Sequence, residues 1–234
     1  MIIVKSALTN YAHRLRLRKV IRRQTAHLNA TVGILFSLGL PANGQVPPDL
    51  LKEIEQFDDI LLANYIDTYL NLTLKTIVNL RIVHRFCLHA SPSFVFLDDD
   101  HAINLTQLHT YFSNFSSSEV RGGIFGFINS NTPVLRAPGR KWFTEREMFP
   151  FAKYPDYAAG PCYILGADLI PKFSIGAAFV RMFPIEDVFV GLITLKLGLR
   201  IHPLPNMYIH QSHLPPHVFP LVAGVDFFNR QLNV

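Results

Sequence analysis

The stretch Phe94–Asp100, F-V-F-L-D-D-D, indicates both the fold and the place of the functional site. Its apolar residues are mostly β-branched or aromatic, which is typical of a buried strand, and three aspartates end it abruptly. Three adjacent carboxylates repel one another unless a cation neutralises them. At the carboxyl end of a buried strand they would lie at the crevice where open α/β sheets bind ligands, and their oxygens would suit Mn²⁺ or Mg²⁺ that also holds substrate phosphates. The alternative is a solvated acidic turn.

Before this stretch, expected strands alternate with expected helices. The predicted strands are Met1–Ala7, Val32–Leu38 and Ile60–Leu62, and the predicted helices are His13–Ala26, Leu50–Gln56 and a long one after Tyr69. Parallel strands that are joined by helices need both sheet faces covered, which explains why the apolar runs are continuous rather than alternating. We therefore expect an α/β fold with a mostly parallel central sheet flanked by helices.

Length and composition are those of one domain. The chain has 234 residues, of which 49% are hydrophobic and 17% charged, enough for one sizeable core. No stretch approaches ~20 uninterrupted apolar residues, so nothing is expected to span a bilayer, and Met1–Val4 is too short for a signal-peptide core. The two cysteines, Cys87 and Cys162, permit one disulfide or two buried thiols and exclude a cysteine-rich zinc site. We expect a single domain over residues 1–234.

The net charge of +5 is concentrated near the start of the chain. Basic residues interleave with apolar ones over Arg14–Arg23, so the predicted helix has a basic face and an apolar face. Such a face suits an anion, for example a nucleotide diphosphate or nucleic acid, and the alternative is a solvated surface helix. Arg18 and Arg22 are four residues apart and would lie on one side of the helix.

After the acidic stretch the pattern becomes less regular. A helix is expected at Leu105–Phe112, and Gly122, Gly123 and Gly126 interrupt an apolar strand. The segment Arg140–Gly160 is irregular and rich in aromatic residues. Such a segment either walls a carbohydrate site, because rings stack on the apolar faces of sugars, or covers the core as a long loop.

Two further segments carry candidate functional residues. Glu186 and Asp187 open an expected helix that ends near Gly198. A carboxylate at a helix start can cap the helix, or it can accept a proton from an attacking hydroxyl if it faces the crevice. Later in the chain, Pro205–Gln211 contains a short expected strand that ends in His210, which is either a metal ligand or a histidine satisfied within the fold.

Several of these segments together resemble one protein family. They are similar, in order and spacing, to the motifs of the β-1,3-galactosyltransferase and β-1,3-N-acetylglucosaminyltransferase family: D-T-Y-L-N-L-T-L-K-T at Asp67–Thr76, F-L-D-D-D-H-A-I-N at Phe96–Asn104, K-W-F at Lys141–Phe143, Y-P-D-Y-A-A-G at Tyr154–Gly160 and E-D-V-F-V-G at Glu186–Gly191. The resemblance runs from about Ile3 to about His210. It implies a GT-A fold, a UDP-sugar donor, Mn²⁺ or Mg²⁺ as the cofactor, and inversion at the anomeric carbon.

Position by position, the resemblance implies a role for each matching residue. Asp98, Asp100 and His210 would hold the metal; Ser6, Arg18, Arg22, Asp98 and Asp99 would bind the donor; Asp187 would be the catalytic base with Glu186 as the fallback; and Trp142, Tyr157 and Gly160 would contact the acceptor sugar. The chain departs from the family pattern in three places: a missing Trp after Arg22, a reduced glycine cluster at Gly160–Cys162, and His101 and Ala102 in place of Val and Phe.

Two classes of function follow from these observations. The resemblance implies an inverting transferase that moves a hexose, either galactose or an N-acetylhexosamine, from a UDP-sugar to a glycan acceptor in β-1,3 linkage. The acceptor would belong to a glycoprotein or glycolipid, with no nucleic acid as partner. As in the family, the chain would be the lumenal catalytic domain of a type II Golgi membrane protein, in contact with the membrane only through an N-terminal anchor absent from this chain. The other class is a catalytically inactive relative that binds as a lectin or a chaperone does.

Overall fold

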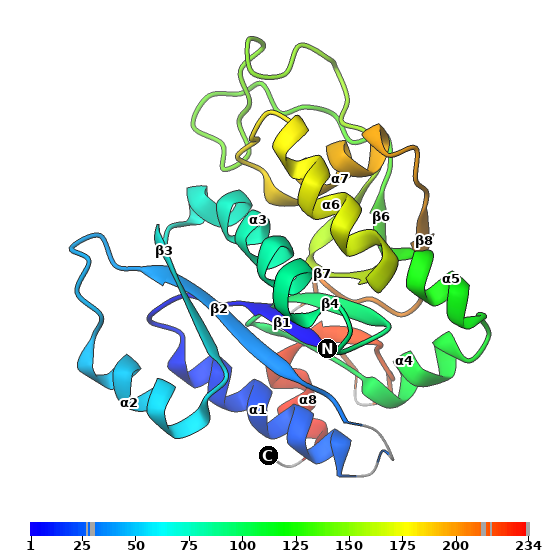
Figure 1. Ribbon diagram of the computed structural model, residues 1–234. Helices are drawn as coiled ribbons and strands as arrows, with labels where there is room; N and C mark the ends of the chain where they lie inside the picture. The colour runs from blue at the N-terminus through cyan, green and yellow to red at the C-terminus, as the bar shows by residue number, and fades with distance from the viewer. Residues whose placement is uncertain (27, 29–30, 212–213, 216, 233–234) are drawn as a thin grey trace.

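The computed structural model describes residues 1–26, 28, 31–211, 214–215 and 217–232. Seven strands of this described chain form one sheet in the order β3-β2-β1-β4-β7-β6-β8 (Figure 1). Their bounds are β1 Ile2–Lys5, β2 Ile34–Leu40, β3 Ile60–Ile66, β4 Ser93–Asp98, β6 Ile124–Asn129, β7 Tyr157–Gly166 and β8 Ile201–Pro203. Within this sheet β7 runs antiparallel to its neighbours β4 and β6, and the other pairs are parallel. The predicted α/β fold with a mostly parallel sheet is confirmed.

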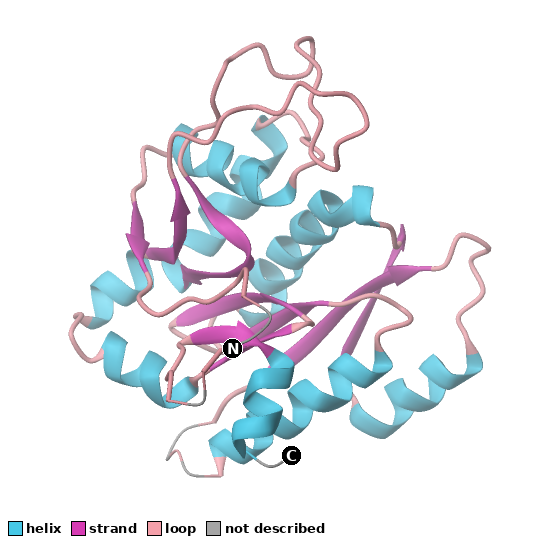
Figure 2. Ribbon diagram, turned by 180° about the vertical axis from the view of Figure 1, so that it is seen from behind, coloured by secondary structure: helices cyan, strands magenta, loops and turns pink. Residues whose placement is uncertain are grey.

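Helices cover both faces of the sheet (Figures 1 and 2). The helices on one face are α1 Tyr11–Thr25, α2 Pro48–Phe57, α4 Leu105–Phe112 and α8 Val225–Leu232, and those on the other are α3 Leu72–Ile82, α6 Ile170–Gly176 and α7 Glu186–Lys196. The helix α5, Ser117–Gly122, leads into β6. A small second sheet pairs β5, His101–Ile103, with β9, Val222–Gly224, directly after the acidic triplet.

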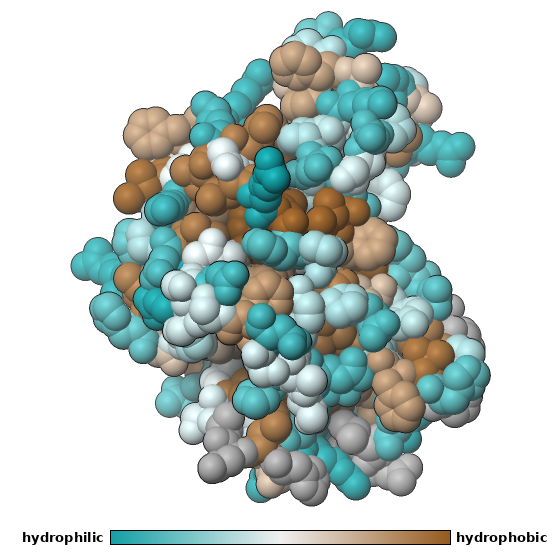
Figure 3. Space-filling model, turned by 90° about the vertical axis from the view of Figure 1, so that its right-hand side faces the viewer, coloured by the Kyte–Doolittle hydropathy of each residue, from teal (hydrophilic) through white to brown (hydrophobic). Residues whose placement is uncertain are grey.

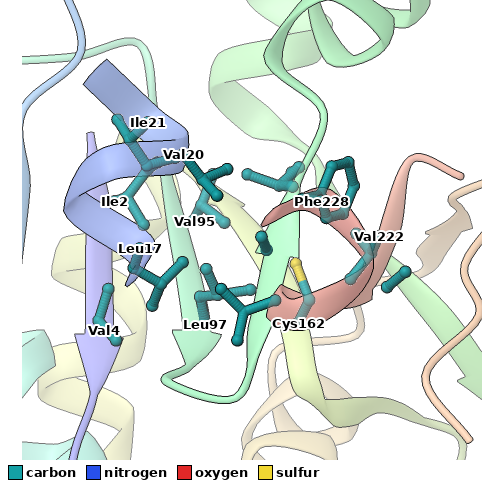
Figure 4. Close-up of a cluster of buried hydrophobic side chains, with 14 of the residues drawn as sticks. Ile2, Val4, Leu17, Val20, Ile21, Val95, Leu97, Cys162, Val222 and Phe228 are labelled. Carbon is teal, nitrogen blue, oxygen red and sulfur yellow. The ribbon is translucent and has the colours of Figure 1, made fainter. Parts of the chain in front are cut away.

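The strand β1 shows why the apolar runs are continuous. Ile2 and Val4 point into one core, where Leu17 of α1 packs against the sheet (Figure 4). Ile3 points to the opposite face and lies in a second core with Leu80 of α3. Because successive side chains of a strand alternate between faces, cover on both faces favours an apolar residue at every position.

Several boundaries differ from the predicted ones. Gly122 ends α5 instead of interrupting a strand, and Tyr157–Gly160 opens β7, so the irregular segment is 140–156. The strand predicted at Pro205–Gln211 is wrong, because its described residues form turns with one isolated bridge, to Val222. Asn206 has a φ of 54°, in the left-handed region, which interrupts an extended backbone.

The two cysteines are free thiols, and the predicted alternative of two buried thiols holds for Cys162, whereas Cys87 is only half-buried. Cys162 lies in the core beneath α8 (Figure 4), and burial raises the pKa of its thiol to about 12. Among the described helices there is none with the length and apolar character needed to cross a membrane.

Candidate active site

A cavity of about 540 Å³ opens at the carboxyl ends of β1 and β4. The strand β7 is antiparallel to β4, so its first residues lie at the same edge of the sheet, and α7 begins there too. Many of the residues selected from the sequence line this cavity: Asp98, Trp142, Tyr157, Gly160, Glu186, Asp187 and His210. The cavity therefore brings together candidates for metal binding, proton transfer and acceptor binding from five separate parts of the chain.

Lys5, the last residue of β1, lies at the centre of the site, although the sequence reasoning did not select it. Its Nζ donates to the carbonyl oxygen of Gly160 at 2.8 Å and lies 3.0 Å from Asp98 Oδ1 and 3.2 Å from Glu186 Oε2. Burial alone would lower the pKa of Lys5, but the two carboxylates outweigh burial and raise the pKa, so Lys5 stays charged. A lysine that ends an otherwise apolar, buried strand was the signal that could have identified it.

Glu186 is a buried carboxylate whose two oxygens are both occupied. Its Oε1 accepts hydrogen bonds from Thr76 Oγ1 at 2.6 Å and from the Tyr163 hydroxyl at 2.9 Å, and its Oε2 faces Lys5. This carboxylate is 6% exposed and pairs with the charged Lys5, whereas the more exposed Asp187 bonds only to backbone N–H groups, so Glu186 is the less well placed of the two to take a proton from a substrate. The geometry therefore argues against the predicted fallback role as base and assigns Glu186 to anchoring the start of α7.

Asp187 is half-buried in the first turn of α7 and lines the cavity. Its Oδ2 accepts from the Gly160 N–H at 3.2 Å and its Oδ1 from the Val188 N–H at 2.9 Å. Burial, followed by the negative charge of Glu186, raises the pKa of Asp187 from 3.8 to about 6. A carboxylate with a pKa close to the working pH is suited to general-base catalysis. The capping and proton-accepting roles, which the sequence left as alternatives, are thus compatible in one residue.

Gly191 sets how closely α7 approaches β7. A Cβ atom on Gly191 would lie 2.6 Å from the Tyr157 Cβ and 3.0 Å from the Asp156 carbonyl oxygen. We expect Gly191→Ala to lower the free energy of unfolding by about 1–3 kcal/mol, because the backbone of β7 cannot yield as a flexible side chain would. Urea denaturation measures this, with Gly122→Ala as the control, since a Cβ there meets nothing within 4 Å. Equal losses in both variants would show that close packing of α7 is not the cause.

Asp99, the middle residue of the triplet, does not line the cavity. It is buried and accepts hydrogen bonds from Ser6 Oγ at 2.6 Å, Asn10 Nδ2 at 3.0 Å and the Ala7 N–H at 3.3 Å. Arg14 Nη1 donates to the same Ser6 hydroxyl at 3.0 Å. The predicted direct contacts of Ser6 and Asp99 with a donor are therefore not favoured, because their side chains are buried against each other and shape the loop between β1 and α1.

Asp98 and Asp100 carry the oxygen atoms that are available for a metal. Asp98 lines the cavity beside Lys5, and Asp100 is exposed, with its Oδ1 2.5 Å from the Nδ1 of His101. This hydrogen bond with His101 is the main reason why the pKa of Asp100 is lowered. Within the described residues no group of three or more His, Cys, Asp or Glu side chains converges. One or two carboxylates still fit Mg²⁺ or Mn²⁺ chemistry, because substrate phosphates and water supply the remaining ligands.

Arg18 and Arg22 of the basic helix α1, which were predicted to bind the donor, do not line the cavity. Arg18 donates to both carboxylate oxygens of Asp59, at 2.8 and 2.7 Å, and to Glu53 at 2.7 Å, and it stacks on the Phe57 ring 3.9 Å from its centre. Arg22 is exposed on the same helix and does not line the cavity. The geometry does not favour the donor-binding role predicted for Arg18, because carboxylates of α2 and the following turn already neutralise it.

The acceptor-side candidates lie on the outer wall of the cavity. Tyr157 is buried at the start of β7, while Trp142 is half-exposed on the irregular segment. The Trp142 Nε1–H donates to the Tyr69 hydroxyl at 3.2 Å, and Lys141 Nζ lies 4.5 Å from the centre of the Tyr69 ring. Of the two readings of the aromatic segment, the part around Trp142 walls the cavity and the part around Phe149 packs into the core.

The sequence matches a family model described as Galactosyltransferase over residues 12–205. The chain belongs to the galactosyltransferase family. The matched range begins in α1 and ends after β8, so it contains every residue that lines the cavity except Lys5 and His210. The resemblance predicted from the motifs is thereby confirmed.

Named relatives of this galactosyltransferase-family chain are of two kinds. The lactosylceramide 1,3-N-acetyl-beta-D-glucosaminyltransferase B of Danio rerio is 28% identical over 225 residues, which cover 93% of this chain and 58% of that protein. The corresponding Mus musculus enzyme is 30% identical over 206 residues, 85% of this chain and 54% of that protein. The beta-1,3-galactosyltransferase 5 of Pan troglodytes is 28% identical over 228 residues, which cover 97% of this chain and 72% of that protein. The chain thus spans little more than half the length of the first two relatives.

A solved structure, that of 4-diphosphocytidyl-2C-methyl-D-erythritol synthase, aligns with 87% of this galactosyltransferase-family chain and 88% of its own, at 10% identity and a TM-score of 0.46. A likeness of this size supports no argument about fold or function.

Proposed function

We propose that this chain is the catalytic domain of an inverting glycosyltransferase that moves galactose or an N-acetylhexosamine from a UDP-sugar to a glycan acceptor in β-1,3 linkage. The observation that carries the proposal is Asp187, a cavity-facing carboxylate whose pKa is raised to about 6. It lies in the same cavity as Asp98 at the end of β4, the candidate donor side. The family match and the names of the relatives support the class of reaction.

The chemistry assigned to Asp187 is proton acceptance. The acceptor hydroxyl oxygen attacks the anomeric carbon of the donor sugar, its proton passes to Asp187, and the bond from that carbon to the diphosphate oxygen breaks. Attack from the side opposite the leaving group converts an α-linked donor into a β-linked product. The Gly160 N–H holds Asp187 in place, and Lys5, which donates to the Gly160 carbonyl oxygen, holds Asp98.

Asp98 and Asp100 would hold Mn²⁺ or Mg²⁺ in this proposal, and the exposed His210 lines the same cavity. A bound divalent ion supplies neutralisation of the diphosphate charge as the leaving group departs. The protein-supplied oxygens are few, which is usual where substrate phosphates complete the coordination.

We expect Asp100→Ala to abolish the Mn²⁺-dependent part of UDP binding, because the exposed Asp100 carboxylate is an ionic ligand that water replaces poorly. Titration calorimetry of UDP with Mn²⁺ and with a chelator measures this. Asp168→Ala is the matched control, since Asp168 is a comparably exposed carboxylate that also faces a basic partner, Arg121, at 2.5 Å. UDP binding of equal strength with Mn²⁺ and with chelator in the wild type would refute the metal assignment.

The test of the function itself is release of UDP from a panel of UDP-sugars in the presence of Mn²⁺ and glycan acceptors. Turnover with one donor, with a β product by NMR, is the expected result. Binding of glycans without UDP release from any donor would instead identify the chain as the inactive, lectin-like relative. The structural reason would be His101, which departs from the family pattern and lies 2.5 Å from the Asp100 carboxylate. We also propose, with the family resemblance as support, that the domain acts at the lumenal face of the Golgi membrane.

A further inference from the structure

Exposed apolar side chains gather around the mouth of the active-site cavity. We call this group the mouth surface: Tyr69 (49% exposed), Leu70 (72%), Leu135 (40%), Trp142 (49%), Phe151 (67%) and Met182 (60%). Tyr69, Leu135 and Trp142 also line the cavity. Single exposed apolar residues are ordinary, but a contiguous group of this size marks an interaction site.

Several contacts show that the mouth surface is continuous. Trp142 bonds to Tyr69, as described above, which joins the irregular segment to the turn before α3. The bridge of Pro133 with Lys153, and the hydrogen bond from the Val134 N–H to the Ala152 carbonyl at 3.0 Å, place Leu135 opposite Phe151. Met182 stands two residues before Pro184, which lines the cavity.

Hydrogen bonds fold the irregular segment that carries Trp142 and Phe151, although this segment projects from the body of the fold. In Figures 1 and 2 the irregular segment forms the loops at the top of the molecule, beyond the sheet and helices. Arg136 fastens it by donating to the carbonyl oxygens of Thr144, Phe149 and Phe151 at 2.8, 2.7 and 2.8 Å. The exposure of the apolar side chains on this segment is therefore a consequence of its hydrogen-bonded fold.

Cationic side chains interleave with the apolar ones. Lys141 is exposed next to Trp142 and lies over the Tyr69 ring, Lys153 follows Phe151, and Arg181 precedes Met182. Arg140 and Arg146 add further exposed positive charge, against Glu145 and Glu147 on the intervening turn. Figure 3, in which these loops again lie at the top, shows hydrophobic and hydrophilic side chains side by side on them.

Tryptophan and tyrosine beside lysine and arginine are the residues that favour the boundary between water and lipid. The aromatic rings enter the headgroup region while the cations meet anionic headgroups. Lysine is depleted at protein–protein interfaces, so the exposed Lys141 and Lys153 favour a bilayer over a protein partner. We propose that the mouth surface docks onto a bilayer that contains anionic lipid, so that the cavity opens toward acceptors carried by that bilayer. Membrane binding itself does not depend on catalysis. Its role in presenting membrane-borne acceptors to the cavity rests on the function proposed above.

The chain carries its own probe for this docking, because Trp142 is its only tryptophan. Vesicles of equimolar phosphatidylcholine and phosphatidylserine should shift the Trp142 emission to the blue and should carry the protein with them on flotation. Vesicles of phosphatidylcholine alone should bind more weakly, and added salt should weaken binding to the anionic vesicles.

The variant pair Leu70→Ser and Phe151→Ser, combined in one protein, should weaken binding to the anionic vesicles at least roughly tenfold, because it removes two exposed apolar side chains. Neither residue lines the cavity. The matched control is Phe86→Ser, since Phe86 is 70% exposed but lies beyond the far end of α3. Thermal unfolding of all variants confirms that each is folded.

Three results would overturn the proposal: no Trp142 shift and no flotation with anionic vesicles, an equal loss of binding in Phe86→Ser, or sedimentation that shows the mouth surface buried in a dimer of this chain. A separate comparison tests the link to catalysis. The double variant should release UDP as the wild type does with a soluble acceptor, and more slowly with the same sugar on a vesicle lipid. If the wild type binds vesicles but releases UDP with no acceptor, the docking stands and the proposed function fails.

Discussion

Replacing Asp187 with asparagine should lower kcat by about 10²–10⁴-fold while UDP affinity stays nearly unchanged. The asparagine side chain keeps one oxygen, so it can accept from either the Gly160 or the Val188 N–H, and the other N–H loses its acceptor at a cost of about 1 kcal/mol. What is lost is the capacity to take a proton from the acceptor hydroxyl. Initial rates of UDP release at saturating donor, together with calorimetry of UDP, separate the chemical step from donor binding.

Glu186→Gln is the internal comparison for this variant. It removes a carboxylate that Thr76, Tyr163 and Lys5 already occupy, so it should cost stability more than turnover. If Glu186→Gln were the inactive variant and Asp187→Asn kept its rate, the base would be Glu186. Near-normal rates in both would remove the carboxylate mechanism altogether.

The raised pKa of Asp187 has consequences of opposite sign for activity and for stability. A base acts only when it is deprotonated, so kcat/KM should fall as the pH drops below about 6. In the folded state the Asp187 carboxyl keeps its proton up to about pH 6, whereas in the unfolded chain it loses the proton near pH 3.8. Between these two values the folded state binds more protons than the unfolded state, so the free energy of unfolding falls as the pH rises through this window. Asp187→Asn should therefore be more stable than the wild type at pH 7, and the difference should close toward pH 4.

Thermal unfolding across pH 4–8 checks this second consequence. A variant that is less active and more stable at neutral pH is the pattern expected of a functional carboxylate held at an energetic cost. If the wild type and Asp187→Asn unfolded with the same pH dependence, burial would not be shifting the pKa of this group.

The parts of the fold that were predicted correctly depend on neighbours in sequence. The strands β1 and β4 and the helix α4 follow from apolar runs and helical spacing, which short segments reveal on their own. Asp98 and Asp187 could be selected because each stands where an element ends or begins.

The site predictions that the geometry does not favour, and the residue that was not predicted, concern partners that are distant in sequence. Arg18 was placed on the correct helix, but its partner Asp59 lies 41 residues away, and no local pattern links the two. Asp99 and Ser6 were both assigned to the donor, whereas 93 residues apart in sequence they bond to each other. The sequence did not predict Lys5 as a site residue, because its three partners come from β4, β7 and α7, which meet only in the folded protein.

Replacing Lys5 with methionine should destabilise the fold by roughly 3–5 kcal/mol and abolish UDP binding, because removal of one partner leaves buried carboxylates uncompensated. Methionine fills a similar volume in the apolar surroundings of β1, so the loss reports the missing charge rather than a cavity. Urea unfolding measures the stability, and UDP calorimetry with Mn²⁺ measures the donor site. The control is Lys52→Met, whose exposed partner Asp49 lies 3.4 Å away and whose loss should cost less than about 1 kcal/mol.

The double variant Lys5→Met with Glu186→Gln keeps this prediction testable if the single variant does not fold. Removing the Glu186 charge as well leaves Asp98 as the one uncompensated carboxylate facing position 5, and Asp98 is partly exposed to solvent. The free energy of unfolding should therefore recover in part. UDP binding should not recover, because Asp98 still lacks the ammonium group that lies 3.0 Å from its Oδ1. A Lys5→Met protein as stable as Lys52→Met, or a double variant no more stable than Lys5→Met, would show that Lys5 does not balance the charge of the site.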